Sequence, residues 1–300
     1  MIPRQRTVFL GNCTTGSFTD AFRIMMPSRE HVGIHVTAPN DPETWNSARN
    51  ACSPAGTRVF VVDSLVPDMI RHCPDIVDYS VVPGISFWGF HPDVVYIGTS
   101  TGWLLSGIGT PWNSRLALSA YLEGIDAEEC VRFFNSRTFG ELGYFDAYVG
   151  AVAAHRARFG AAGVDAAAWL DAMAPQGNFL HGPNHPYVSG IGYLAFQVAR
   201  REGFPLDRNL DFHRPEFWTS YLTDYLHRIV WPVYPEIAEH LGVPGAYLFR
   251  NEAKVVDLKE FVVACYEKWD AAALDRSQLS GGQFDSLVNR SRLHRDGPAS

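Results

Sequence analysis

The sequence predicts an α/β protein, with a small parallel sheet built from βαβ units followed by a predominantly helical C-terminal half. Short apolar runs alternate with amphipathic segments over residues 6–97, and this alternation is typical of right-handed βαβ units in a parallel sheet. From residue 113 onward almost every segment has the apolar spacing of a helix. With 300 residues the chain is long enough to bury its own core without disulfides or metals.

The N-terminal elements follow from their apolar patterns and their turn residues. Strands are expected over residues 7–10, 32–36, 58–63, 81–87 and 94–97, and helices over 14–26, 41–50 and 64–72. The segment 58–63, RVFVVD, is the clearest strand, because a continuous apolar run suits a parallel strand that is buried on both faces.

The C-terminal half is read as a series of helices. They are expected over residues 113–124, 142–159, 164–173, 188–201, 215–229, 233–241 and 257–269, with one more that begins at residue 126. Capping boxes are predicted at Asp126 and Asp257, because a glutamate follows each aspartate three residues later. We therefore expect a single catalytic domain over 1–270, with an α/β core over 1–112 and a mainly helical part over 113–270. Residues 271–300 are polar and are expected to form a mobile tail.

Composition and charge exclude several classes of protein. Lysine and arginine number 25 against 32 aspartates and glutamates, a formal net charge of −7, which argues against a nucleic-acid binder. The five cysteines include no CxxC pair, so neither a disulfide framework nor a zinc ribbon is expected. The N-terminal apolar run is too short for a signal peptide and no segment is long enough to span a membrane. We expect a reduced, cytoplasmic protein without a metal.

The first candidate site is Gly11-Asn12-Cys13, between the first strand and the first helix. This corner lies at the carboxyl edge of a parallel sheet, where α/β proteins bind ligands. The amides of a helix N-terminus favour an anion, so we expect a lowered thiol pKa and a nucleophilic Cys13. The Cys13 amide and the Asn12 side chain are candidate oxyanion donors. The alternative is that Cys13 is only a small buried residue.

The second candidate is Asn184-His185-Pro186, ahead of the helix expected from residue 188. Its pattern, H-P-x-x-x-G-x-x-x-x-A, is similar to the catalytic-histidine block of the SGNH (GDSL-like) hydrolases. That resemblance implies His185 as base and Cys13 at the nucleophile position, supported by Asn184. The sequence departs at Gly182, where those enzymes have an aspartate. The acid partner of His185 is therefore open, His181 is a nearby rival, and a purely structural histidine is the alternative.

The third candidate is Phe90-His91-Pro92-Asp93, in a turn between two predicted strands. His91 and Asp93 are close enough in sequence to hydrogen-bond each other or a ligand, which makes them candidate supporting residues. An Asx-type turn stabilised by Asp93 is the alternative.

Taken together, VFLGNC, VVPGISFWGFHPD and PNHP resemble the WcbI family of polysaccharide-biosynthesis acetyltransferases, over most of residues 6–270. The resemblance implies a coenzyme A-binding enzyme that O-acetylates a sugar of a capsular or related polysaccharide. Phosphates of coenzyme A need cations or helix N-termini, and Thr14, Arg23 and Arg115 are the candidates for this role. The family commonly has glutamine where this chain has Thr14, which leaves open the contact that the amide would make.

Two other functions stay open at this point. An esterase or deacetylase would use the same nucleophile and base and would differ only in admitting water. A non-catalytic protein that binds coenzyme A or a saccharide would explain the missing acid at Gly182. The G-x-S-x-G motif over residues 98–102 is interpreted as a loop, because the glycines and Pro111 that follow it interrupt any helix.

Overall fold

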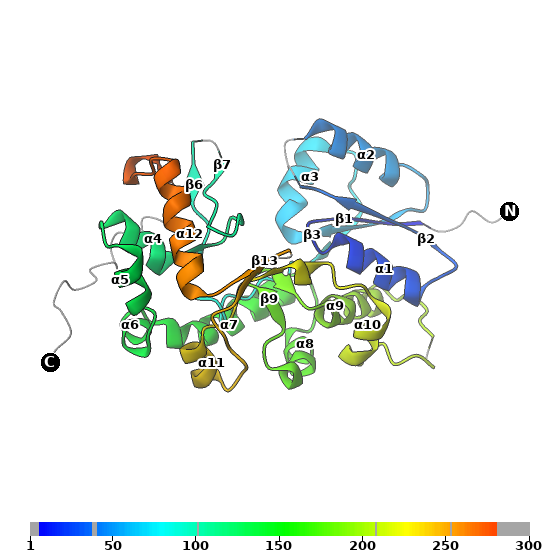
Figure 1. Ribbon diagram of the computed structural model, residues 1–300. Coiled ribbons are helices and arrows are strands. Elements are labelled where there is room, and N and C mark those ends of the chain that lie inside the picture. The colour runs from blue at the N-terminus through cyan, green and yellow to red at the C-terminus, as the bar shows by residue number, and fades with distance from the viewer. Residues whose placement is uncertain (1–5, 38–40, 101, 208, 253, 281–300) are drawn as a thin grey trace. The chain divides into compact units, whose positions relative to one another are not determined.

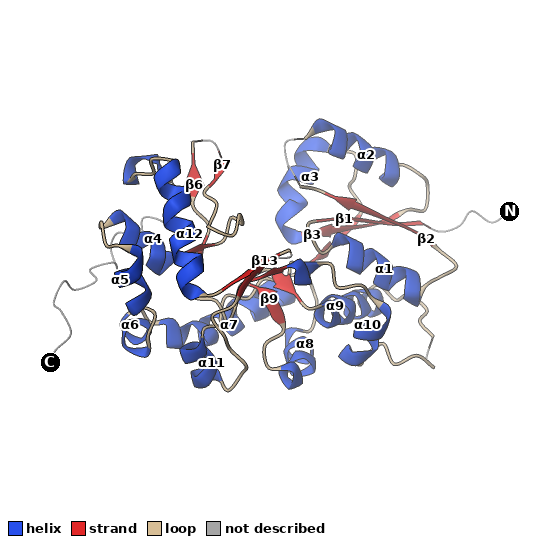
Figure 2. Cartoon of the chain, in the orientation of Figure 1, coloured by secondary structure: helices blue, strands red, loops and turns tan. Residues whose placement is uncertain are grey.

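The computed structural model describes residues 6–37, 41–100, 102–207, 209–252 and 254–280 (Figures 1 and 2). The chain divides into two compact units, and each is built from two separate stretches of sequence. One unit comprises the chain up to Phe87 together with Ala151–His227, and the other comprises Trp88–Gly150 together with the chain from Arg228. The unit that holds the N-terminal sheet thus also takes in residues 151–227, and the expected single catalytic domain over 1–270 stays a prediction.

The first unit contains a four-stranded parallel sheet in the order β2-β1-β3-β4. Its strands are β1 (Arg6–Gly11), β2 (Glu30–His35), β3 (Arg58–Val62) and β4 (Tyr79–Val82). This confirms the predicted α/β class with parallel βαβ units. The strand order reverses between β1 and β3, and in open α/β sheets such a reversal marks the ligand-binding crevice at the carboxyl edge.

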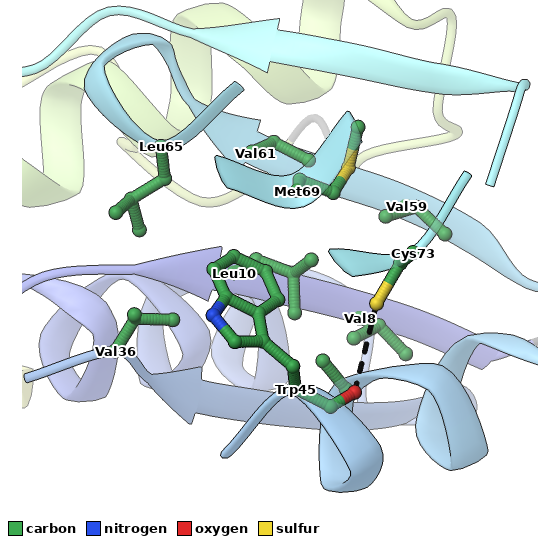
Figure 3. Packing of buried hydrophobic residues seen from close by; sticks show 10 residues of the cluster. Val8, Leu10, Val36, Trp45, Val59, Val61, Leu65, Met69 and Cys73 are labelled. Atoms are coloured by element: carbon green, nitrogen blue, oxygen red, sulfur yellow. Dashed lines mark hydrogen bonds between the residues drawn. The ribbon is translucent and has the colours of Figure 1, made fainter. Parts of the chain in front are cut away.

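One face of this sheet is covered by α2 (Pro42–Cys52) and α3 (Val66–His72). Alternate residues of β1 and β3 point to this face, as the two-residue period of a strand requires. Figure 3 shows the resulting cluster, in which each side chain is at most 6% exposed. Its members are Val8, Leu10, Val36, Trp45, Ala48, Val59, Val61, Leu65, Met69 and Cys73.

The opposite face of the sheet is aromatic and is covered by α1 (Thr15–Met25). The rings of Phe9 and Phe18 stack with centroids 4.2 Å apart, and Phe22 meets Phe60 edge-on at 5.2 Å. Helix α9 (Val188–Arg201) packs against α1, and the two are side by side in Figure 1. The sheet is thus sandwiched between helices on both faces.

Two further helices of this unit, α8 (Ala166–Met173) and α10 (Pro215–Tyr221), pack against α9. The larger part of α7 (Ala147–Ala161) also belongs to this unit, and its His155 and Phe159 rings lie against Trp169 of α8. The predicted helix over 215–229 ends early at Tyr221, because Leu222 is already extended, with φ −106° and ψ 143°. Gly192 of α9 lies against Trp218 of α10 so closely that an added Cβ would be 2.3 Å from the indole ring.

The second unit is mainly helical, with short antiparallel strands. Its α-helices are α4 (Arg115–Leu122), α5 (Ala127–Arg132), α6 (Ser136–Glu141), α11 (Pro235–Leu241) and α12 (Leu258–Ala271). The short strands are β5 (Val94–Val95) with β8 (Asn113–Ser114), β6 (Gly98–Thr99) with β7 (Gly102–Trp103), and β11 (Ile229–Val230), β12 (Phe249–Asn251) and β13 (Lys254–Val256). Asp257 forms the predicted capping box with Glu260. The G-x-S-x-G segment belongs to the β6–β7 hairpin and does not lead into a helix.

Residues 272–280 do not form the polar tail expected from residue 271. Leu274 and Leu279 are at most 9% exposed, and Ser280 exchanges two backbone hydrogen bonds with Gly98. The prediction overlooked these two leucines because isolated apolar residues have no periodicity. Residues 281–300 lie outside the described residues. Within the described ranges, no helix is both long and apolar enough to cross a membrane.

Candidate functional site

The turn after β1 brings Cys13 to the carboxyl edge of the sheet. Gly11 ends β1 where space is minimal, because an added Cβ would be 2.7 Å from the Phe9 ring and from Thr15 Oγ1. Asn12 Oδ1 accepts hydrogen bonds from Thr14 N at 3.1 Å and Thr14 Oγ1 at 3.0 Å. The Asn12 carbonyl accepts from Thr15 N at 3.0 Å. These bonds fix Cys13 immediately before the first turn of α1.

The Cys13 thiol is half-buried, and its Sγ lies 3.9 Å from Asn12 Oδ1. Burial raises the pKa of the Cys13 thiol to about 11, and a backbone hydrogen bond only partly opposes this. The predicted lowering of its pKa by the helix N-terminus is therefore wrong, because the loss of water around a thiolate outweighs the helix dipole. At pH 7 the thiol is neutral and needs a base to become a nucleophile.

The loops that follow β3 and β4 lie on the same edge and carry an ion pair that the sequence analysis missed. Asp63 Oδ1 accepts from Gly84 N at 3.1 Å, which ties the two loops together. Arg158 Nε lies 3.4 Å from Asp63 Oδ2, and Arg158 Nη1 donates to Ser86 Oγ at 2.8 Å. The Arg158 side chain is 43% exposed, so this guanidinium presents a positive charge at the sheet edge.

His185 lies in a hairpin formed by β9 (Leu180–Gly182) and β10 (His185–Pro186). The Phe87 amide, on the segment that leaves β4, donates to the Pro183 carbonyl at 2.7 Å. That bond holds the hairpin against the exit of β4, on the carboxyl edge. Asn184 is in the turn of this hairpin and is half-buried.

Burial lowers the pKa of His185 to about 4, the neighbouring His181 lowers it further, and Asp224 opposes the shift. The His185 imidazole is therefore neutral at pH 7. Gly182, which faces His185 across the hairpin, has no carboxylate to offer it.

A carboxylate does reach the hairpin, but it binds His181. Asp224 Oδ2 lies 2.8 Å from His181 Nε2, and the Tyr187 ring packs on the His181 ring with centroids 4.4 Å apart. Although burial opposes it, hydrogen bonds from His181 and from the backbone of Val188 and Leu226 hold the pKa of Asp224 below its usual value. The sequence analysis named His181 only as a rival and missed Asp224, since nothing local marks a carboxylate 43 residues away.

The Cys13 turn and the histidine hairpin lie at the same end of two packed helices. Ser17, in the first turn of α1, donates to the Thr223 carbonyl at 3.4 Å. The adjacent Asp224 accepts from the amide of Val188, the first residue of α9. At the far end, Phe22 of α1 meets Phe204, which follows α9, with ring centroids 6.1 Å apart. The first turn of α1 therefore contacts Thr223 and the first residue of α9 contacts Asp224, which is adjacent in sequence.

His91 and Asp93 belong to the other unit, and their side chains have internal partners. The Asp93 carboxylate is fully buried and accepts from Tyr144 Oη at 2.8 Å and Tyr234 Oη at 2.7 Å. His91 Nε2 donates to the Trp231 carbonyl at 2.9 Å rather than to Asp93, and burial lowers the His91 pKa to about 3. His91 and Asp93 therefore do not hydrogen-bond each other. Each bonds instead to other groups buried in the same unit.

Of the three candidate contacts to coenzyme A, Thr14 is adjacent to Cys13 in the turn before α1. Arg23 is in the last turn of α1, about 12 Å along the helix from its first residue. It is ion-paired with Asp20 and donates to the His31 carbonyl at 3.1 Å. Arg115 opens α4 in the other unit, where its amide donates to the Asp93 carbonyl. The roles of Arg23 and Arg115 in binding coenzyme A stay predictions.

Two further observations concern metal binding and a surface pocket. Across the described residues, no group of three or more histidines, cysteines or carboxylates is arranged to hold a metal ion. A surface pocket of about 580 Å³ lies beside the C-terminal end of α9, lined by residues from Phe196 to His213, and contains neither Cys13 nor His185. The candidate chemistry is therefore a thiol and two imidazoles on the carboxyl edge of the sheet.

Comparison with known proteins gives a consistent result. Residues 7–207 match the family described as the polysaccharide biosynthesis enzyme WcbI. A solved structure of WcbI, a polysaccharide biosynthesis enzyme, described as the native protein without a disulfide bond between coenzyme A and a cysteine, is similar over 96% of this chain and 99% of that chain. The TM-score is 0.59 and the identity 13%, a likeness in fold. No curated protein matches the chain.

Proposed function

Since the chain belongs to the WcbI family of polysaccharide biosynthesis enzymes, we propose that it is a coenzyme A-dependent O-acetyltransferase acting on a saccharide hydroxyl. The observation that carries this proposal is the placement of Cys13 and the hairpin with His181 and His185 at one end of α1 and α9. Acyl transfer needs a nucleophile, a base and hydrogen-bond donors for the developing oxyanion. These residue types meet at the sheet edge.

The same edge suits an anionic, phosphate-bearing ligand such as coenzyme A, which supplies the acetyl group as a thioester. The N-terminus of α1 lies there, and helix N-termini favour phosphates. Arg158 adds an exposed guanidinium beside the exits of β3 and β4. We assign phosphate binding to Arg158 and the α1 N-terminus, with Thr14 as a neighbour, in place of Arg23 and Arg115.

In the proposed reaction Cys13 is the nucleophile, a hairpin imidazole is the base, and nearby amides stabilise the oxyanion. The neutral Cys13 thiol gives its proton to an imidazole of the hairpin as its sulfur bonds to the acyl carbon. The bond between that carbon and the coenzyme A sulfur breaks, and the imidazole returns the proton to this sulfur, which leaves as a thiol. The saccharide hydroxyl then gives its proton to the imidazole and displaces Cys13, whose sulfur takes that proton back. The alternative is direct attack by the hydroxyl after an imidazole removes its proton. The candidate oxyanion donors are the side-chain nitrogen of Asn12 and the backbone amide of Cys13. The hydrogen bond from Thr14 to Asn12 Oδ1 fixes the Asn12 side chain.

The test joins binding with turnover. Calorimetry with coenzyme A and acetyl-coenzyme A is expected to show binding, and acetyl transfer to a panel of saccharides is expected to fall at least a hundredfold in Cys13→Ala. The double variant Cys13→Ala with His181→Ala should lose little more than the worse single variant, because residues that act as a unit are non-additive. Cys52→Ala, at the half-buried end of α2, is the matched control and should keep full activity.

The contrary outcomes are distinct. Folded protein that binds neither form of coenzyme A would remove the proposed cofactor and the transferase with it. Acetyl-coenzyme A hydrolysis at the same rate with and without saccharide would identify water as the acceptor and the protein as a hydrolase. Full transfer in Cys13→Ala would leave direct attack as the route.

A further inference from the structure

We propose that His181, held by Asp224, is the general base that removes the proton of the acceptor hydroxyl, and that Asp224 is its positioning residue. This inference rests on the proposed function and names the residue that moves the proton at the same site. His185, which the sequence favoured as base, then lines the site as a neutral imidazole.

The first argument is the geometry of the pair. The 2.8 Å contact joins Asp224 Oδ2 to His181 Nε2. A carboxylate can only accept in such a bond, so Nε2 carries the proton of the neutral ring. That tautomer leaves the lone pair on Nδ1, where a proton can be accepted. The carboxylate also stabilises the positive ring that forms, which is the role of the aspartate in a serine-protease triad.

The second argument is that the pair is fixed from several sides. The backbone amides of Leu226, at 3.2 Å, and of Val188 donate to Asp224. The Tyr187 ring lies against His181, 4.4 Å between centroids. A base that is already oriented loses little freedom when the substrate arrives, and this preorganisation favours the reaction.

The position of Asp224 relative to α1 also supports the assignment. The neighbour of Asp224, Thr223, accepts from Ser17 in the first turn of α1, and Cys13 lies just before that turn. The Asp224 carboxylate is thus anchored next to the helix terminus where we place the thioester. The titratable groups that surround His181 are Asp224, His185 and Tyr187.

The contrast with His185 supports the assignment. Gly182 faces His185 across the hairpin, and burial keeps the His185 pKa at about 4. An imidazole with so low a pKa is a weak base near pH 7, whereas general bases work best when their pKa is close to the working pH.

The proposed step is balanced. As the hydroxyl oxygen bonds to the acyl carbon, its proton passes to His181 Nδ1. The carbon–sulfur bond of the thioester breaks, and His181 returns the proton to the departing sulfur, which leaves as a thiol. The ester product carries the acyl group, and no oxidant or metal is needed.

The experiment compares three variants of the full chain: His181→Gln, Asp224→Asn and His185→Gln. We expect acetyl transfer to fall at least a hundredfold in His181→Gln, about tenfold to a hundredfold in Asp224→Asn, and less than tenfold in His185→Gln. The matched control His213→Gln, at an exposed position, should keep the wild-type rate. The dissociation constant for coenzyme A should stay within about twofold in all three. In His181→Ala, added imidazole should restore part of the rate, which a purely structural role would not allow.

A second measurement does not depend on activity. Nitrogen NMR of the histidine rings should show His181 protonated on Nε2 in the wild type, with this tautomer less populated in Asp224→Asn. Protonation on Nδ1, or a hundredfold loss in His185→Gln together with an active His181→Gln, would overturn the proposal. A wild type that transfers no acetyl group to any saccharide would instead refute the proposed function, and the tautomer would still decide the assignment of His181.

Discussion

Cys13 and Arg158 show how single side chains set the chemistry at the sheet edge. The positive end of a helix dipole is worth about half an elementary charge and acts only over the first turn, so its effect on a thiol pKa competes with the cost of removing water from the thiolate. At Cys13 burial dominates and raises the pKa to about 11. Arg158 keeps its charge exposed beside Asp63. The edge therefore combines a protonated thiol with a cation, and the proposed role of Cys13 as nucleophile requires a separate base.

Replacing Arg158 with alanine is expected to weaken coenzyme A binding about tenfold. A hydrogen bond to a charged group contributes about 1.5 kcal/mol or more, and 1.4 kcal/mol corresponds to a factor of ten in the dissociation constant. Isothermal titration calorimetry measures this change directly. Arg71→Ala is the matched control, because Arg71 is also ion-paired and exposed but lies in the last turn of α3. Equal affinities in Arg158→Ala and the wild type would exclude Arg158 from the phosphate site.

The residues that could be predicted from sequence are those marked by their immediate neighbours. Gly11-Asn12-Cys13 stands between a strand and a helix, and that context alone locates Cys13 at the carboxyl edge. Asp224 has no such context, because its partner His181 is reached only after α9 and α10 have packed together. The catalytic roles of Cys13 and His185 stay predictions.

Among the elements, the early end of α10 is decisive for the site. The helical pattern of the sequence runs to residue 229, yet the helix stops at Tyr221 and residues 222–224 are available to contact the first turns of α1 and α9. A helix continued through residue 224 would commit the Asp224 amide and carbonyl to the helix. The apolar strands β1 and β3 were predictable because most of their residues are apolar and buried. The two-residue strands of β9–β10 carry no such signal.

The close packing of α9 on α10 predicts a sensitive glycine. A Cβ on Gly192 would be 2.3 Å from the Trp218 ring, which is 0% exposed and cannot move away freely. Gly192→Ala is therefore expected to lower the free energy of unfolding by about 1–3 kcal/mol, the usual range for overpacking a core. Urea denaturation measures the change. Gly150→Ala in α7 is the control: an added Cβ there meets nothing within 4 Å, so the variant should be as stable as the wild type or up to about 1 kcal/mol more stable. Equal stability of the two variants would contradict the packing argument.

For the molecule as a whole, the division into units follows from contacts between distant parts of the sequence. Helices of residues 151–227 pack on the sheet formed before residue 87, so each unit takes two stretches of chain. Local periodicity gives the class of each element but contains no information on its distant partner. The fold class was nevertheless predictable, since the alternation of strands and helices over 6–97 is local.

Buried histidines occur in both units and predict how stability depends on pH. Burial lowers the pKa of His91 to about 3 and the pKa values of His155 and His185 to about 4, against an ordinary 6.5. As the pH falls below 6.5 the unfolded chain takes up protons at these residues before the folded chain does, so stability present at pH 7 is lost toward pH 4. Carboxylates such as Asp224, with a lowered pKa, lose their contribution only at lower pH. Between about pH 6.5 and pH 4.5 the loss of stability therefore comes from the histidines.

His155 isolates one of these contributions. It is 2% exposed and lies against Phe159 and Trp169, with ring centroids 4.0 and 4.8 Å away. Neither of its ring nitrogens has a hydrogen-bond partner within the described part of the chain, so a phenyl ring can replace the imidazole without leaving a polar group unsatisfied. Between pH 7 and pH 5 we expect the wild type to lose stability, with His155 contributing on the order of 1–2 kcal/mol.

The variant His155→Phe should lose less stability over the same range by about that amount, as measured by urea unfolding at pH 7, 6 and 5. His213→Asn, at an exposed position, should follow the wild type. If His155→Phe declined as steeply as the wild type, protonation of His155 would not be coupled to unfolding, and the acid sensitivity would have to come from the other buried histidines. A shallower decline would identify the aromatic surroundings of His155 as a source of acid sensitivity separate from the sheet edge that carries the chemistry.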